Sequence, residues 1–492
     1  MVRIFLPLTA PTEGEGGEGE KNACGMPLQA CWPDCCSFPT RALLILVPER
    51  GMHPGAFSGI GASVAKRCSL QAGSGVQVQT ILNFVEPFKS FVYRRVDWDE
   101  QATRPTLRVK IEPRANGRPV CSGCRQVRPG YDRLPERTWE FVPLWQISVL
   151  FVYALRRVDC PDCGIVAEEV PWSRGKHRQT RTYRWFLARW AQRLSWQEVA
   201  NIFSTSWDTV YRAVRYAVEW GLVHRDLRGV EALGIDEIQY QRGHRYLTMV
   251  YQIDGQIRRL LWVGQNRTTE ALESFFDLFG GEILPTLKFV CSDMWKPYLD
   301  VIRARAGEAV HILDRYHIMA KMNKAIDEIR AGEAKRLKAD GYEPVLKHSR
   351  WCLLKRRENL TAKETVKLRE VLQYNLKTVR AHLSREEFQR FWTYQSATWA
   401  AKFLREWCSR TMRSGLEPMK KIARSLREHE PLLLNWFRAH GEISAGAVEG
   451  LNLKAKLTLR KAFGFRTFEG IETALYHQLG HLPEPEFTHE FC

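Results

Sequence analysis

Four cysteines in two closely spaced pairs are the first residues whose spacing predicts chemistry. Cys121-Ser-Gly-Cys124 and Cys160-Pro-Asp-Cys163 are CxxC pairs, and each has a glycine in it or directly after it that favours a tight turn. Four thiolates suit the tetrahedral coordination of Zn²⁺ and leave no open position, so we expect a structural zinc site rather than a catalytic one. Four unliganded thiols are the alternative. Strand-like runs at 138–142 and 146–155 predict a hairpin between the two pairs.

Three acidic residues far apart in the chain predict a second site. Asp236 lies inside a strand-like run, Asp293 follows a short buried one, and Glu449 lies on a predicted helix. The predicted order is three antiparallel strands, helix, strand, helix, strand and helix, which is an α/β fold with ribonuclease-H-like topology. In that topology Asp236 and Asp293 lie on adjacent strands. The ranges are 230–240, 245–253 and 256–264 for the first strands, 269–279 and 295–306 for helices, and 287–291 and 309–313 for the last strands.

The predicted helix around Glu449 can both pack on a sheet and present polar groups. Glu449, Asn452 and Lys456 share one face at spacings i, i+3 and i+7, beside a stripe of apolar residues. We expect Glu449 to turn toward the edge that carries the two aspartates, with Asn452 and Lys456 contacting DNA phosphate. An exposed surface glutamate is the alternative.

Three short helices before the first acid predict a helix-turn-helix. Residues 181–194 are helix-patterned, and Ser195-Trp-Gln-Glu198 is a capping box that starts a second helix. The third helix is expected over 207–220, with Gly221 as its terminating glycine. In a helix-turn-helix the second of the two helices reads DNA in the major groove, and here that helix is the one expected over 207–220. The residues expected to face DNA are Ser206, Asp208, Thr209, Arg212 and Arg215, although many three-helix units are only packing modules.

Composition narrows the class of protein. The chain has 492 residues, 45% of them hydrophobic, and a formal net charge of +18, which favours a polyanionic partner such as nucleic acid. Its apolar runs are far shorter than the roughly 18 residues of a membrane-spanning helix. The odd count of 13 cysteines does not suit a disulfide framework, so we expect a cytoplasmic, nucleoid-associated protein.

The distribution of charge and of helix-like and strand-like patterns along the sequence also suggests domain boundaries. Residues 1–78 hold equal numbers of basic and acidic residues, so the whole net charge lies in 79–492. We interpret 1–77 as a disordered leader or an early start, although four of its cysteines could form a small metal knot. We then expect a zinc ribbon over 78–172, a helix-turn-helix over 173–225 and a catalytic domain over 226–485. An all-α insertion is expected at about 318–445, with helices at 321–338, 361–383, 385–407 and 416–429.

Over residues 78–485 the sequence resembles the ISL-type insertion-sequence transposases of bacteria. The resemblance rests on the paired CxxC, Gly234-Ile-Asp236-Glu, Ser292-Asp293-Met-Trp, Asp314-Arg-Tyr-His317 and Val448-Glu449-Gly-Leu-Asn452. It implies a DDE nuclease with Asp236, Asp293 and Glu449 as its catalytic triad, and with Asp314 and His317 organising the site. Leu453 departs from the family pattern, which has a polar residue there, but it leaves the triad untouched.

The expected reaction is phosphoryl transfer on double-stranded DNA. The three acids would hold two magnesium or manganese ions about 4 Å apart, for in-line cleavage at the transposon ends and joining to target DNA. The enzyme would bind terminal inverted repeats and act as a homo-oligomer that holds two ends together. Two alternatives remain. One is a non-catalytic zinc and helix-turn-helix regulator or a domesticated transposase, and the other is a structure-selective nuclease that cuts without joining.

Overall fold

The computed structural model describes residues 77–486 apart from 242, 244, 256, 440–445 and 463. Nearly all of the predicted leader, including its cysteines, lies outside the described residues. The first part is a twisted sheet preceded by a helix, with Trp139, Phe151 and Trp172 in its core. The predicted hairpin is confirmed, with longer strands. The elements are α2 (Val78–Val85), β1 (Phe91–Trp98), β2 (Thr106–Pro113), β3 (Gly130–Leu144), β4 (Ile147–Cys160) and β5 (Gly164–Ala167), in the order β1-β2-β4-β3 with β5 beside β4.

Three helices follow, as the sequence predicts. They are α3 (Arg181–Arg193), α4 (Trp196–Ile202) and α5 (Trp207–His224). The capping box at Ser195 is present, with both the side-chain and the backbone bond to Glu198. The expectation for Gly221 was wrong, because α5 continues through it and ends at His224. A Cβ at Gly221 would lie 2.6 Å from Cβ of Leu482, so this glycine makes room for the C-terminal segment.

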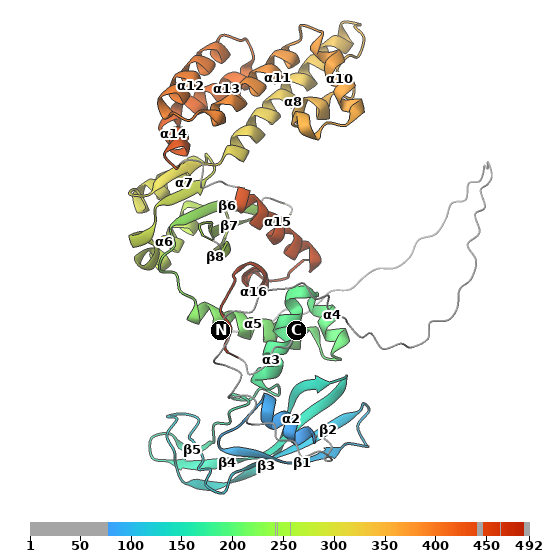
Figure 1. The fold of residues 1–492 in the computed structure, drawn as a ribbon, viewed down its shortest axis with the longest axis vertical. Helices are drawn as coiled ribbons and strands as arrows, with labels where there is room; N and C mark the ends of the chain where they lie inside the picture. The colour runs from blue at the N-terminus through green and yellow to red at the C-terminus, as the bar shows by residue number, and fades with distance from the viewer. Residues whose placement is uncertain are drawn as a thin grey trace, which may run out of the picture. The chain divides into compact units, whose positions relative to one another are not determined.

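A second sheet follows these helices in the chain (Figure 1), with Asp236 in one of its strands and Asp293 directly after another. Its strands are β6 (Ala232–Gln241), β7 (Arg245–Gln252), β8 (Arg259–Gln265), β9 (Phe289–Ser292) and β10 (Val310–Leu313). The spatial order is β10-β9-β6-β7-β8, with β6, β7 and β8 antiparallel and β9 and β10 parallel to β6. The intervening helices are α6 (Thr269–Ile283), the short 3₁₀ helix η2 (Leu284–Thr286) and α7 (Lys296–Arg305). The strand and helix order predicted from the sequence is therefore confirmed.

Alternate residues of β6 face two different cores. Leu233 and Ile235 pack with α6 and α7, whereas Ala232 and Ile238 share a core with α3, α5 and two C-terminal helices. These last helices are α15 (Gly446–Lys461) and α16 (Phe468–Leu479). The three-helix unit of α3, α4 and α5 and the second sheet thus share one apolar core.

Every regular element that the structure describes between β10 and α15 is a helix. Its elements are α8 (Arg315–Ala339), α9 (Arg350–Leu354), η3 (Arg357–Asn359), α10 (Ala362–Leu372), α11 (Lys377–Phe388), η4 (Gln389–Thr393), α12 (Ala397–Met412), α13 (Glu417–Glu428) and α14 (Glu430–Arg438). Two predicted helices were wrong in extent, because 361–383 is divided at Gln373–Leu376 and 385–407 is divided between η4 and α12. Among the described residues, none of the helices has the length and apolar character needed to cross a membrane.

Candidate functional site

Three aspartates occupy corresponding positions on neighbouring strands, one within β6 and the other two directly after β9 and β10. Parallel pairing places Gly234 beside Cys291 and Leu313 beside Ser292. Asp236 lies two residues beyond Gly234, Asp293 directly follows β9, and Asp314 directly follows β10. The backbone N–H of Asp314 donates to the carbonyl of Ser292 at 2.8 Å, which continues the register past the strands. The sheet therefore brings the predicted pair Asp236 and Asp293 to one edge and adds Asp314 to it.

Asp236 is held on both oxygens. Its Oδ1 accepts from the backbone N–H of Glu237 at 2.8 Å, and its Oδ2 accepts from Nδ2 of Asn452 at 2.5 Å. The side chain of Asp236 is only 12% exposed. The two bonds fix the direction in which this carboxylate presents its remaining lone pairs.

Asp293 is held by the turn that follows it and by a basic side chain. Oδ1 of Asp293 accepts from the backbone N–H of Trp295 at 2.8 Å, and Oδ2 accepts from Arg267 at 3.3 Å. The Arg267 guanidinium stacks 4.3 Å from the Trp295 ring centroid and donates from Nε to Glu237 at 2.7 Å. Burial, followed by repulsion from Asp293, raises the pKa of Glu237 to about 7.

His317 lies between two of the aspartates. Its Nε2 is 3.6 Å from Oδ1 of Asp236 and 3.6 Å from Oδ2 of Asp314, and interaction with Asp236 and then Asp314 raises the pKa of His317 to about 9. Asp314 also caps α8 by accepting from the N–H of Tyr316 at 2.7 Å. Burial raises the pKa of Asp314 to about 6, although His317 opposes the shift. The positive imidazole therefore offsets the repulsion between the acids.

Glu449 lies in the first turn of α15, a helix that packs against β6 (Figure 1). Its side chain is exposed and near enough to raise the pKa of Asp314 by repulsion. Val448 and Leu451 face the shared core, and Asn452 on the next turn reaches Asp236. Asn452 is 6% exposed, so the structure places it inside the site rather than in the predicted contact with DNA phosphate. Lys456 is exposed, as that contact requires.

Gly234 is the residue that lets α15 approach the strand. A Cβ at this position would lie 2.4 Å from Cγ2 of Val448 and 3.0 Å from Cγ2 of Ile253. We expect Gly234→Ala to push α15 away from β6, with a destabilisation of about 1–3 kcal/mol. Adding Val448→Ala should restore part of the lost stability, as measured by thermal unfolding. Equal stability of Gly234→Ala and wild type would show that this contact does not position α15.

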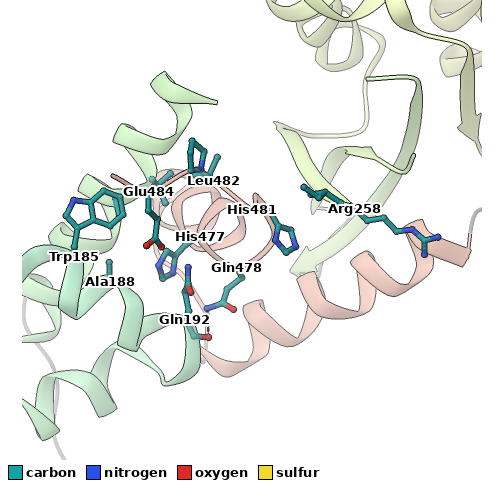
Figure 2. Close-up of a pocket in the computed structure, with 13 residues that line it drawn as sticks. Trp185, Ala188, Gln192, Arg258, His477, Gln478, His481, Leu482 and Glu484 are labelled. Atoms are coloured by element: carbon teal, nitrogen blue, oxygen red, sulfur yellow. Dashed lines mark hydrogen bonds between the residues drawn. The ribbon is translucent and has the colours of Figure 1, made fainter. Parts of the chain in front are cut away.

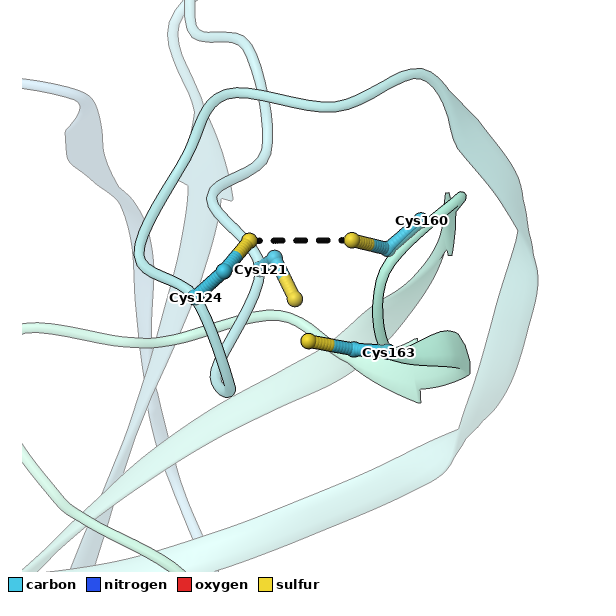
Figure 3. A group of neighbouring side chains, drawn as sticks. All are labelled: Cys121, Cys124, Cys160 and Cys163. Atoms are coloured by element: carbon cyan, nitrogen blue, oxygen red, sulfur yellow. Dashed lines mark hydrogen bonds between the residues drawn. The ribbon is translucent and has the colours of Figure 1, made fainter.

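The four predicted zinc ligands converge at the other candidate site (Figure 3). The sulfurs of Cys121, Cys124, Cys160 and Cys163 all lie within 4.8 Å of one another, and Sγ of Cys124 is 3.6 Å from Sγ of Cys160. A Cβ at Gly123 would lie 2.7 Å from Sγ of Cys163, so the glycine in the first CxxC is required for this convergence. Among the described residues, these cysteines are the one set of three or more potential ligands that converges so closely, and the carboxylates of the other site are spread more widely.

The residues expected to face DNA lie at the start and on the outer face of α5. Ser206 caps the helix by accepting from the N–H of Thr209 at 3.1 Å, and their hydroxyls are 2.9 Å apart. Arg212 forms an ion pair with Asp208, and Arg215 pairs with Glu219 at 2.7 Å and with Glu469 at 2.8 Å. A phosphate would have to compete with these carboxylates for the two arginines.

Three residues of the acid site were missed at the sequence level, namely Glu237, Arg267 and Tyr251. Glu237 follows Asp236 in a strand, so alternation directs it to the opposite face, and its role depends on Arg267 reaching back from the loop after β8. Tyr251 donates to Oδ1 of Asn452 at 2.7 Å and reads in the sequence as an ordinary core residue. The acid directly after Asp236 was the one available signal.

A pocket of about 540 Å³ lies elsewhere, between α3, α5, the loop before β8 and the segment after α16 (Figure 2). Its lining includes Trp185, Arg258, His477 and Glu484. Glu484 accepts from Arg189 at 2.8 Å, which ties the C-terminal segment to α3. None of the predicted acids lines this pocket, so it is distinct from the acid site.

Acid sensitivity is expected from a histidine beside the second aspartate. Burial lowers the pKa of His311 from 6.5 to about 4, and its Nε2 lies 2.8 Å from Oγ of Ser292. Between these pH values the unfolded chain binds a proton that the folded chain does not, so the free energy of unfolding should fall as pH decreases from 6.5 to 4. The expected loss is about 3 kcal/mol at most. Urea unfolding of wild type and His311→Asn at pH 7.5, 6 and 5 measures it, and parallel curves would contradict the assignment.

Comparison with known proteins shows what this chain is similar to. A family model described as "Transposase", of the ISL3 DDE type, matches residues 233–475. The transposase for insertion sequence element IS1001 of Bordetella parapertussis is 28% identical over 386 residues, covering 78% of this chain and 93% of that protein. The transposase for insertion sequence element IS1557 of Mycobacterium tuberculosis (strain CDC 1551 / Oshkosh) is 26% identical over 435 residues, covering 80% and 94%.

Proposed function

We propose that this chain, whose residues 233–475 match the ISL3-type transposase family model, binds the terminal inverted repeats of an insertion sequence and catalyses metal-dependent strand cleavage and strand transfer. The observation that carries this proposal is the alignment of Asp236 and Asp293 at one sheet edge, with the helix of Glu449 joined to that edge through Asn452. Transposition and DNA recombination are accordingly the processes in which the family acts.

We interpret the catalytic core as ribonuclease-H-like. A five-stranded mixed sheet with three antiparallel strands followed by two parallel ones, in the order β8-β7-β6-β9-β10, supports this fold. The proposed catalytic domain spans 226–485 and has an all-α insertion at about 318–445, in which the described elements from α8 to α14 are helical. The zinc ribbon at 78–172 and the helix-turn-helix at 173–225 complete the proposed organisation.

The acid site fits a hard divalent cation. Asp236, Asp293 and Glu449 offer carboxylate oxygens, which magnesium and manganese prefer. In support, the pairing of β6 with β9 aligns the two aspartates, and α15, which carries Glu449, packs against β6. Two such ions, when bound, activate the attacking oxygen and stabilise the leaving oxygen of an in-line displacement at phosphorus. The three acids are therefore the proposed catalytic residues, with Asp314 and His317 organising the site.

The basic side chains of the site have a role of their own. Arg267 contacts Asp293, His317 lies between Asp236 and Asp314, and Lys321 is close enough to Asp293 to interact with it electrostatically. Burial lowers the pKa of Lys321, which is the expected effect of an apolar neighbourhood on an ammonium group. These three groups offset the negative charge of the acids, so that a DNA phosphate can approach. The attacking oxygen comes from water or a DNA 3′-hydroxyl, and no covalent protein intermediate is required.

The four cysteines fit a structural zinc ion by their number, softness and convergence. We propose that this zinc module and α5 bind the transposon end, with Ser206, Thr209, Arg212, Arg215 and Lys456 as DNA contacts. Joining two ends to one target requires both ends to be held together, so a homo-oligomer on DNA is proposed. The cytoplasm, on the nucleoid, is the proposed location.

A joining assay tests the function. Duplex oligonucleotides that carry the terminal repeats flanking the gene are incubated with the full chain, Mg²⁺ and a supercoiled target plasmid. Joined product supports the transposase. Specific binding with neither cleavage nor joining supports the regulator, and cleavage without joining supports the structure-selective nuclease.

A further inference from the structure

A buried tyrosine and a buried asparagine form a hydrogen-bonded chain that ends on the first aspartate. The hydroxyl of Tyr251 on β7 donates to Oδ1 of Asn452 at 2.7 Å, and Nδ2 of Asn452 donates to Oδ2 of Asp236 at 2.5 Å. Tyr251 is 0% exposed and Asn452 is 6% exposed. Water therefore has little access to these two hydrogen bonds, and they are stronger than similar bonds at the surface.

The chemistry of these groups permits one orientation of the amide. An ionised carboxylate only accepts hydrogen bonds, so the NH₂ end of Asn452 must face Asp236. The carbonyl end then faces Tyr251, whose hydroxyl supplies the donor that this oxygen needs. A phenylalanine at 251 would leave a buried amide oxygen without that partner, and the amide would lose its fixed direction.

The position of Asn452 on α15 links these hydrogen bonds to Glu449. Asn452 lies one turn after Glu449, so the rotation of the helix that directs Asn452 to Asp236 also sets the direction of Glu449. Val448, Leu451 and Ala455 bury the apolar side of α15 in the shared core, but apolar contacts tolerate sliding and rotation. Hydrogen bonds are directional, and they weaken steeply when their angle changes.

We propose that Tyr251 and Asn452 are positioning residues that fix the rotation of α15, so that Glu449 and Asp236 act on the same bound cation. This inference rests on the proposed function, and it gives Asn452 a role within the site in place of a contact with DNA. Loss of the hydrogen bonds from Tyr251 to Asn452 and from Asn452 to Asp236 should leave DNA-end binding intact. It should raise the concentration of Mg²⁺ that strand transfer requires.

The test measures strand transfer by the full chain as a function of Mg²⁺ concentration. We expect Tyr251→Phe to raise the concentration of Mg²⁺ at half-maximal rate about tenfold, the change expected for one lost buried hydrogen bond, and Asn452→Ala to raise it further. End binding in EDTA should stay within about twofold of wild type for both variants. The double variant should be no worse than Asn452→Ala alone, because both residues act through one bond to Asp236.

Matched controls separate positioning from general destabilisation. Tyr298→Phe removes another buried tyrosine hydroxyl, one that lies 2.7 Å from Oγ1 of Thr248. Asn435→Ala removes a buried amide that donates to the backbone carbonyl of His311 at 2.8 Å. We expect both to keep the wild-type Mg²⁺ dependence even where thermal unfolding shows a similar loss of stability. A wild-type Mg²⁺ dependence for Tyr251→Phe, or additive effects in the double variant, would overturn the inference alone. Absence of joining by the wild-type protein would instead overturn the proposed function.

Discussion

Replacing Asp236 with asparagine should reduce strand transfer about a thousandfold or more while leaving DNA-end binding in EDTA unchanged. The substitution keeps the shape of the side chain but removes the charge and one oxygen ligand, and it places a second amide opposite Nδ2 of Asn452. A loss of this size corresponds to about 4 kcal/mol of transition-state stabilisation, in the range expected for metal-assisted catalysis. Joining of pre-cut ends, followed on denaturing gels, measures it.

Glu231→Gln is the matched control for this experiment. Glu231 precedes the same strand and its carboxylate is half-exposed, paired with Lys288 at 2.7 Å. An exposed ion pair of this kind contributes about 0–1 kcal/mol, so the variant should join ends at close to the wild-type rate. Joining by Asp236→Asn at more than a tenth of the wild-type rate would remove Asp236 from the proposed catalytic residues.

The double variant Cys121→Ser, Cys124→Ser should lose its zinc and at least about tenfold in affinity for a transposon end. These residues supply two of the four sulfurs that converge within 4.8 Å, and apparent binding energies for structural zinc are about 10–16 kcal/mol in small zinc modules. Loss of the ion should therefore unfold the loops around it. Metal analysis by mass spectrometry and fluorescence anisotropy with a labelled end measure the two effects.

Cys408→Ala provides the comparison for this loss. Cys408 is fully buried in α12, so the variant removes a thiol without touching the four-cysteine group. We expect it to retain zinc and end binding. End binding by the double cysteine variant with the affinity of wild type would show that the zinc module does not contribute to recognition.

The order of strands and helices could be predicted because residues close in the sequence to each element determine where it begins and ends. Strand-like runs at 230–240 and 245–253 marked β6 and β7, Asp254-Gly255 marked the turn before β8, and Ser195 with Glu198 marked the start of α4. Placing Asp236 and Asp293 on neighbouring strands followed from that order. The four cysteines were predictable from spacing alone.

Features that depend on distant residues could not be predicted. Gly221 looked like the end of a helix, but its place is decided by Leu482, far away in the sequence. Asn452 shares a helical face with Lys456, and only the arrival of Tyr251 and Asp236 decides that one is buried while the other is exposed. The boundaries of the helices between 361 and 407 were missed because charged residues there obscure the period of the apolar ones.

The shared core also determines when folding can be completed during synthesis, because it needs α15 and α16. Helices α15 and α16 are synthesised after the sheet that they cover, and they supply Glu449 and pack against α3 and α5. A nascent or truncated chain that ends within the helical segment would therefore lack both the third acid and the apolar support of the three-helix unit of α3, α4 and α5. Under the proposed function, DNA recognition and DNA cutting should consequently both require α15 and α16, so that a chain without these helices would have neither activity.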